Sequence, residues 1–124
     1  MTKHNSIAVK RMEKIGINEN FTVLDEEIKT VHSGSYGRLD PDSIAPTITT
    51  RFDTPSGGRF IHPFENRTIT PREAARIQSF PDTFRFIGNK GSQMKQVGNA
   101  VPPKLAAAIA SVIMKDIKEG IENE

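Results

Sequence analysis

The chain has 124 residues, of which 35% are hydrophobic, and it contains neither cysteine nor tryptophan, so it suits one small domain or part of a larger one. The missing cysteines exclude disulfides, a thiolate metal site and a cysteine nucleophile, and the three histidines, at positions 4, 32 and 62, are too far apart for a local zinc motif. No run of about 18 apolar residues and no secretory signal occurs, so we expect a soluble, cytoplasmic protein without a membrane partner.

The formal net charge is only +2, but basic residues are concentrated in residues 51–104. That stretch holds nine arginines and lysines against four aspartates and glutamates, a local excess of +5. Such an excess is typical of a surface that binds a polyanion, and it also fits a solvated basic face without a ligand. Charge alone leaves both interpretations open.

The first predicted element is a short helix over residues 6–15. Its apolar residues recur at helical spacing, namely Ala8, Met12 and Ile15. Asn5 or Ser6 can cap the start of this helix, and Gly16 can end it. Residues 16–42 lack a clear period and are rich in turn formers, which predicts a loop with short strands.

The middle of the chain predicts two strands and a second helix. Residues 46–52 and 59–62 favour strands because they are rich in β-branched or aromatic side chains, and a loop with two glycines separates them. A capping box predicts the helix, which should run over residues 71–78 with Thr70 as the cap and Glu73 as its partner. Its expected buried face consists of Ala74, Ala75 and Ile77.

The last predicted helix begins near Pro103 and is the longest. One stripe along it is strongly apolar and consists of Leu105, Ile109, Val112, Ile113 and Ile117. We expect this stripe to be buried against the rest of the chain or against a second copy of it. Together these elements predict an α+β fold, a small partial domain with short irregular β-strands and two or three helices.

Two segments carry the sequence motifs. Residues 96–103 form a turn that leads into the last helix, in which Gly98 can adopt a positive φ. In residues 66–81 three arginines, Arg67, Arg72 and Arg76, are expected to form ion pairs with Glu65, Glu73 and Asp82 more readily than to bind phosphate. The three phenylalanines that follow, Phe80, Phe84 and Phe86, are expected to anchor the core.

Together these segments resemble the DNA (cytosine-5) methyltransferase family. Residues 67–81 are similar to the family's ninth motif and residues 96–103 to its tenth, in the family's order and spacing. Upstream, residues 35–39 and 45–49 resemble the end of its target-recognition region. The resemblance divides the chain into residues 1–66, part of that region, and residues 67–124, the two motifs with the C-terminal helix.

The resemblance implies roles for individual residues. A complete enzyme of the family flips a cytosine out of the duplex, attacks it with a cysteine and transfers methyl from S-adenosylmethionine. The implied cofactor contacts are Gly98, Asn99, Ala100 and Val101. The implied contacts with double-stranded DNA are Arg38, Thr47, Arg51, Gly57, Gly58 and Arg59, where arginine can bind guanine bidentately and glycine permits close approach.

The family's early motifs are missing from these 124 residues, including the Pro-Cys nucleophile and the Gly-rich cofactor turn. No catalytic residue and no metal ligand is therefore assigned. We expect a fragment or subunit of a restriction-modification methyltransferase that binds DNA and S-adenosylmethionine beside a separate catalytic chain and is inactive alone. A homodimer through the C-terminal helix, a non-catalytic DNA-binding module and a truncated remnant are the alternatives.

Overall fold

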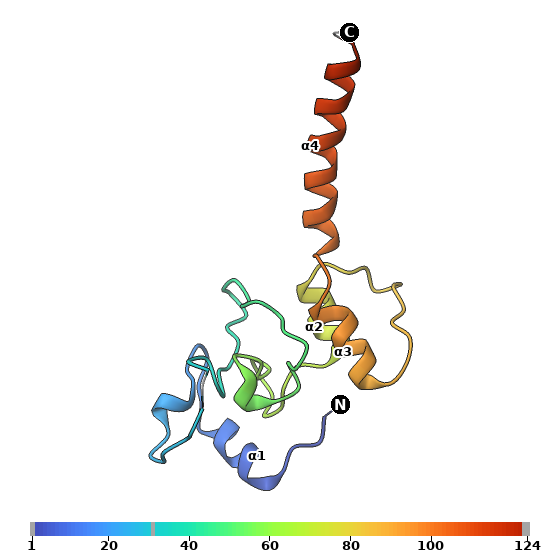
Figure 1. Cartoon of the computed structure of the whole chain (residues 1–124). Helices are drawn as coiled ribbons and strands as arrows, with labels where there is room; N and C mark the ends of the chain where they lie inside the picture. The colour runs from blue at the N-terminus through green and yellow to red at the C-terminus, as the bar shows by residue number, and fades with distance from the viewer. Residues whose placement is uncertain (1, 31, 123–124) are drawn as a thin grey trace.

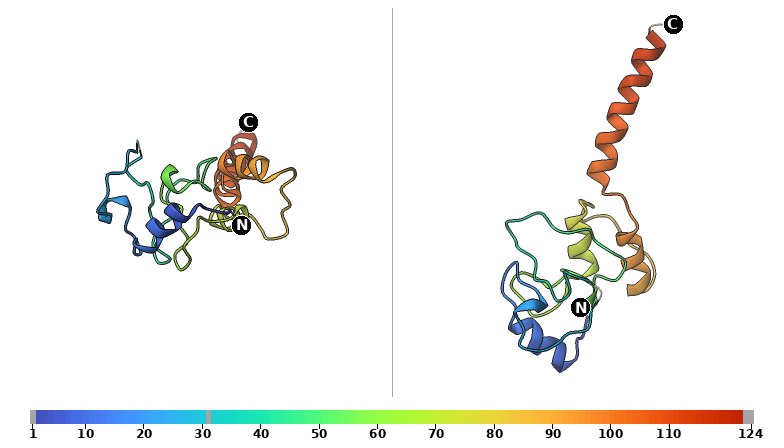
Figure 2. Two further views of the ribbon diagram at one scale, coloured as in Figure 1. Left: turned by 90° about the horizontal axis from the view of Figure 1, so that it is seen from below. Right: turned by 60° about the vertical axis from the view of Figure 1, so that its left-hand side comes forward.

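The computed structural model describes residues 2–30 and 32–122. Its helical elements, in chain order, are α1 (Ser6–Glu13), η1 (Phe21–Val23), η2 (Pro55–Gly57), α2 (Pro71–Ile77), α3 (Lys90–Gly98) and α4 (Pro103–Glu122). Figure 1 shows a body of long loops and short helices, from one end of which α4 projects. The views in Figure 2 show the same projection, so the molecule consists of a packed body and a free helix.

The two predicted N-terminal and central helices form for the expected local reasons. In α1 the side chain of Asn5 accepts a hydrogen bond from the amide of Ala8 at 2.7 Å. In α2 the Thr70 hydroxyl accepts from the Glu73 amide at 3.2 Å, and the Glu73 carboxylate accepts from the Thr70 amide at 2.7 Å. Both caps satisfy amide groups that a helix start leaves without partners.

The predicted strands do not form. Among the described residues the backbone pairs only at isolated bridges, between Arg38 and Ile61 and between Ile61 and Thr68. Residues 46–52 form no bridge with any described residue, and the end of α3 packs against their backbone at Thr49. The predicted α+β class is therefore confirmed only in its helices, of which α4 is the longest.

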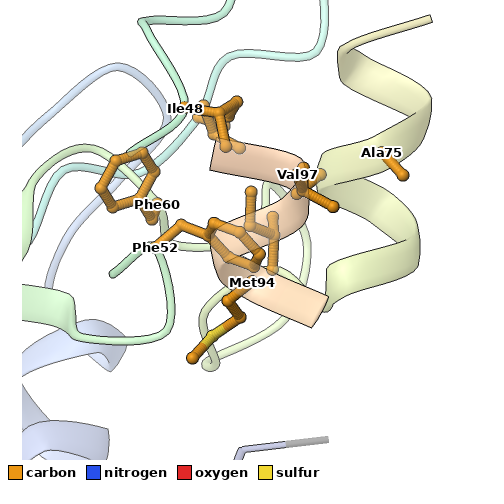
Figure 3. Close-up of a cluster of buried hydrophobic side chains, with 9 residues drawn as sticks. Ile48, Phe52, Phe60, Ala75, Met94 and Val97 are labelled. Atoms are coloured by element: carbon orange, nitrogen blue, oxygen red, sulfur yellow. The ribbon is translucent and has the colours of Figure 1, made fainter. Parts of the chain in front are cut away.

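Two hydrophobic clusters build the body. The first joins the middle of the chain to α2 and α3, and Figure 3 shows its side chains converging between these elements. Its buried members are Leu39, Ile48, Phe52, Phe60, Ile69, Ala74, Ala75, Met94 and Val97. The second packs α1 against the following loops through Ala8, Met12, Ile15, Leu24, Tyr36 and Ile61. Because the first cluster draws on both sides of residue 66, residues 1–66 and 67–124 share one core.

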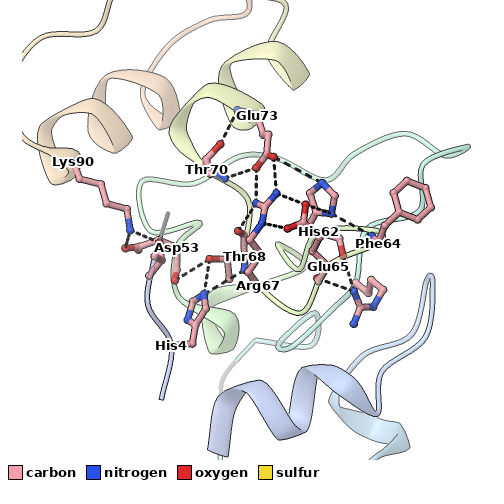
Figure 4. Close-up of polar contacts among 12 residues, drawn as sticks. His4, Asp53, His62, Phe64, Glu65, Arg67, Thr68, Thr70, Glu73 and Lys90 are labelled. Carbon is pink, nitrogen blue, oxygen red and sulfur yellow. Dashed lines mark hydrogen bonds and ion pairs between the residues drawn. The ribbon is translucent and has the colours of Figure 1, made fainter. Parts of the chain in front are cut away.

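Ion pairs lie at both ends of α2. Arg67 donates to the carboxylates of Glu65 and Glu73, each at 2.8 Å, as Figure 4 shows. The hydrogen bonds from Arg67 lower the pKa of Glu73 to about 2. Arg76 pairs with Asp82 at 2.7 Å, so structural pairing is confirmed for these two arginines.

Arg72 differs from its two neighbours because it has no carboxylate partner among the described residues. It donates to the carbonyl of Phe84 at 2.8 Å and lies over the ring of Phe86, 5.7 Å from the ring centroid. Phe80, the third ring, lies 5.1 Å from that of Phe86, and both pack on the first hydrophobic cluster. Phe80 and Phe86 therefore serve the predicted role of core anchors, while Phe84 stays 44% exposed.

Helix α4 makes no packing contact that buries it. Every described side chain from Lys104 to Ile121 is exposed. The prediction that the apolar stripe of α4 is buried against the rest of the chain is therefore wrong, because α4 projects away from the body, as Figure 1 shows, while its burial against a second copy stays a prediction. By length and composition alone, the stretch Lys90–Ile121 contains a window apolar enough to cross a membrane, with mean hydropathy 1.4.

Candidate functional site

The motif assigned to the cofactor starts inside a helix that was not predicted. Asn89 caps α3 by accepting from the Ser92 amide at 2.9 Å, a signal that the neighbouring glycines conceal in the sequence. Gly98 is the last residue of α3, and positive φ values occur at other glycines, so its predicted positive φ is wrong. A Cβ at Gly98 would lie 2.6 Å from the carbonyl carbon of Thr49. Glycine is needed here for close backbone approach.

Helices α3 and α4 are joined by residues 99–102, here named the cofactor loop. Asn99 forms the C-cap of α3, and its side chain is exposed, as is that of Val101. Gly98 and Ala100 line a pocket of about 320 Å³ together with Thr47, which was assigned to DNA. The structure thus brings two predicted cofactor residues beside a predicted recognition residue, whereas Asn99 and Val101 do not line this pocket.

The predicted DNA contacts fall into two groups. Thr47, Gly57, Gly58 and Arg59 all line one open depression of about 450 Å³. Gly58 has a φ of 152°, and a Cβ there would lie 2.7 Å from the ring of Phe60, so only glycine fits without a shift. The adjoining Arg51 is exposed, and no described residue pairs with its side chain. Five of the six predicted contacts therefore lie in or beside one surface.

Arg59 lies at this depression with part of its guanidinium engaged. It donates to the carbonyl of Asn18 at 3.1 Å and also contacts the side-chain oxygen of Asn18. Its aliphatic stem covers Gly37, where a Cβ would lie 2.7 Å away. Asn18 and the packing on Gly37 thus hold Arg59 in place, and within residues 2–30 and 32–122 its other guanidinium nitrogens have no hydrogen-bond partner.

Arg38, the sixth predicted DNA contact, lies inside the protein. Its side chain donates to the carbonyls of Met12 (2.6 Å), Ile15 (2.7 Å), His62 (2.7 Å) and Glu65 (3.0 Å) and to Oδ1 of Asn66 (2.8 Å). Only 6% of the residue is exposed, and burial lowers the pKa of Arg38. The prediction that Arg38 contacts DNA is therefore corrected. Its guanidinium is buried and joins Met12 and Ile15 to residues 62–66.

The basic excess of residues 51–104 is only partly free. Arg67, Arg76 and Lys90 form ion pairs with carboxylates. Within residues 2–30 and 32–122, four exposed cations of this stretch have no side-chain partner, namely Arg51, Arg85, Lys95 and Lys104. Arg51 alone of these adjoins the depression, so the local charge available there is smaller than the sequence indicates.

Comparison with known proteins places these motifs in a family. The family described as C-5 cytosine-specific DNA methylase matches residues 1–115. The Type II methyltransferase M.AquIB of Picosynechococcus sp. is 39% identical over 129 residues, covering 94% of this chain and 88% of that protein. The DNA (cytosine-5)-methyltransferase PliMCI of Paracentrotus lividus is 47% identical over 83 residues, covering 65% of this chain but 5% of that enzyme.

A solved structure supports the same assignment. The crystal structure of a protein described as a DNA modification methyltransferase encoded within an E. coli prophage has a TM-score of 0.58 and 35% identity. It matches 82% of this chain, which spans 24% of that protein. Sequence and fold agree, and the chain belongs to the C-5 cytosine-specific DNA methylase family.

Proposed function

We propose that this chain is the part of a DNA (cytosine-5) methyltransferase that recognises DNA and completes the S-adenosylmethionine pocket, and that it transfers no methyl group alone. The reaction needs a thiolate nucleophile, and these 124 residues contain no cysteine. A separate catalytic chain would supply it. The observation that carries the proposal is the exposed apolar face of α4, which starts directly after the cofactor loop.

The shape of that face favours a large partner over a second copy of the chain. At about 100° per residue, its large apolar side chains span an arc of roughly 200°. They are Leu105, Ile109, Val112, Ile113, Met114, Ile117 and Ile121, each at least half exposed. Lys104, Lys115 and Lys118 occupy the opposite side, and Asp116 interrupts the arc. A surface helix that packs on one core commonly carries an apolar stripe of about 100°, so this wider arc fits a groove in a larger domain better than a single packed helix.

The relatives support a separate partner chain. This chain spans 88% of M.AquIB, a protein named as a Type II methyltransferase. It spans only 27% of the Type II methyltransferase M1.BsuMI of Bacillus subtilis and 5% of PliMCI. A unit of this size thus makes up most of one relative and a minor part of others. We infer a restriction-modification role in the cytoplasm.

The site is proposed in two parts. DNA would contact the depression lined by Thr47, Gly57, Gly58 and Arg59, with Arg51 beside it. S-adenosylmethionine would contact the cofactor loop, through the Asn99 side chain and the backbone from Gly98 to Val101, once the partner completes the pocket. The pocket that contains both Thr47 and Ala100 lies between these parts.

Duplex binding at low salt tests the recognition half. We expect Arg51→Ala and Arg59→Ala to weaken binding of a fluorescent duplex to the chain with its catalytic partner, and to lower the salt dependence. Arg76→Ala is the matched control, because it removes the same charge from an exposed ion pair with Asp82. Equal affinities for all three variants would contradict the proposal.

A non-catalytic DNA-binding module is the second candidate, and the unpaired Arg51 beside the depression favours it. Under that function the chain binds duplex DNA without a partner, and α4 associates with no catalytic domain. A truncated remnant would bind neither DNA nor a partner. Binding measurements with and without the catalytic chain separate all three.

A further inference from the structure

Two consecutive residues at the end of α2 hold both ends of the cofactor loop. Gln78, which is only 8% exposed, donates from Nε2 to the carbonyl of Val97 at 2.6 Å, just before the loop. Ser79 accepts at Oγ from the amide of Lys104 at 3.2 Å, just after the loop. Both ends of the loop are therefore held by the consecutive residues Gln78 and Ser79.

The Gln78 contact adds a short hydrogen bond at a carbonyl that ends α3. The carbonyl of Val97 belongs to the last turn of α3, where it also accepts a longer hydrogen bond from the amide of Ala100 at 3.3 Å. Val97 itself is fully buried in the first hydrophobic cluster. The amide of Gln78 thus fixes the end of α3 from the neighbouring helix.

The Ser79 contact replaces a missing helix cap. The residue before α4 is Pro102, which has no side-chain acceptor, and the first residue of α4 is Pro103, which has no amide hydrogen. The hydroxyl of Ser79 accepts from the second helical residue, as an N-cap side chain would. Ser79 has a φ of 63°, a conformation that costs energy for a non-glycine residue.

Gly98 provides a third fixed point. Its close approach to the backbone of Thr49 and Thr50 leaves no room for a Cβ and sets the distance between α3 and the segment that contains these two threonines. The loop is thus anchored at both ends, while Asn99 and Val101 remain exposed. A loop held in this way loses less conformational entropy when a ligand orders it.

We propose that Gln78 and Ser79 are positioning residues that preorganise the cofactor loop and set the direction in which α4 leaves the body. The role of the loop in holding S-adenosylmethionine rests on the proposed function above. The preorganisation itself belongs to this chain and exists without a partner. It can therefore be measured on the full chain alone.

Nuclear spin relaxation of the full chain tests the order of the loop. In the native chain we expect the amide order parameters of Asn99, Ala100 and Val101 to be about 0.85, as in rigid backbone. In the variant that combines Gln78→Met with Ser79→Gly we expect them to fall below about 0.6. Glycine accommodates the positive φ, so the body should stay folded. With Gln78 retained, Ser79→Asn should leave the loop ordered, because asparagine tolerates this φ and keeps an acceptor.

Gln93→Met is the matched control, because it removes another glutamine bond to a backbone carbonyl, the one to Gly88 at 3.0 Å. It should leave the loop unchanged. With the catalytic chain present, calorimetry with S-adenosylhomocysteine should show a roughly tenfold higher Kd for the double variant, with DNA affinity changed less than about twofold.

An unchanged order of the loop in the double variant, with the body folded, would overturn the proposal. Equal loosening by the Gln93 control would overturn it as well. A loop that loosens only in the double variant supports the proposal, even where no catalytic chain associates and the proposed function fails. Conversely, methyl transfer together with order parameters of the loop that neither substitution changes supports the proposed function and refutes the positioning role.

Discussion

Replacing Arg38 with methionine tests whether this arginine supports the fold or contacts DNA. The substitution keeps an unbranched apolar stem but removes a guanidinium that reaches five acceptors within 3.0 Å. A hydrogen bond from a charged donor contributes roughly 1.5–3 kcal/mol. The sum of five such bonds is an upper limit, because burying the charge opposes it, as the lowered pKa of Arg38 indicates.

We therefore expect Arg38→Met to lower the free energy of unfolding by about 3–5 kcal/mol, much of the roughly 5–15 kcal/mol of a small domain. Urea unfolding followed by circular dichroism at the helical band measures this loss. Arg51→Met is the control, because Arg51 is exposed and unpaired among the described residues. It should change stability by less than about 0.5 kcal/mol. Unchanged stability in Arg38→Met with weakened DNA binding would refute the structural role.

Three further results are expected. Gly98→Ala should lower the free energy of unfolding by about 1–3 kcal/mol, because its Cβ meets the Thr49 backbone, and thermal unfolding that matches the native chain would contradict this. Glu73 has a folded pKa of about 2 instead of 4.5, so its stabilisation is complete above pH 4.5 and is lost as the pH falls towards 2. Urea titrations across this window should show a smaller loss for Glu73→Gln. Ile109→Asp should abolish association with the catalytic chain in sedimentation while the body stays folded, because Ile109 lies on the free helix.

The helices with strong local signals were predictable from the sequence. The capping box at Thr70 and Glu73 fixes the start of α2, and the Asn5 cap fixes the start of α1, through bonds within four residues. The beginning of α4 at Pro103 was predictable for another reason, because proline is favoured at the first position of a helix. The family was also predictable, because its motifs are continuous stretches of sequence.

Features that depend on distant partners were not predictable. The β-branched residues of segment 46–52 favour a strand, but α3 lies where a paired strand would be needed. Ile77 has the helical spacing of a core residue, yet it is 41% exposed because it lies at the rim of a pocket. Arg38 resembles a recognition residue in the sequence, because the carbonyls of Met12 and Ile15 that it binds are 23 or more positions away.

Which cations of residues 51–104 are paired was not predictable either. The excess of nine cations over four anions in this stretch indicates a polyanion-binding surface. In the structure Arg67 and Arg76 form ion pairs with neighbouring carboxylates, while the side chain of Arg51 has no partner among the described residues. A charge count cannot separate these cases, because pairing depends on which side chains the fold brings within about 4 Å.

Methyl transfer by a mixture of two chains tests whether this chain completes a methyltransferase. The chain would be combined with a catalytic chain that carries the Pro-Cys nucleophile and the Gly-rich cofactor turn, and incorporation of tritiated methyl groups into duplex DNA would be counted. We expect no incorporation by this chain alone and incorporation by the mixture. Incorporation by this chain alone, or none by a complex whose association has been demonstrated, would contradict the proposed function.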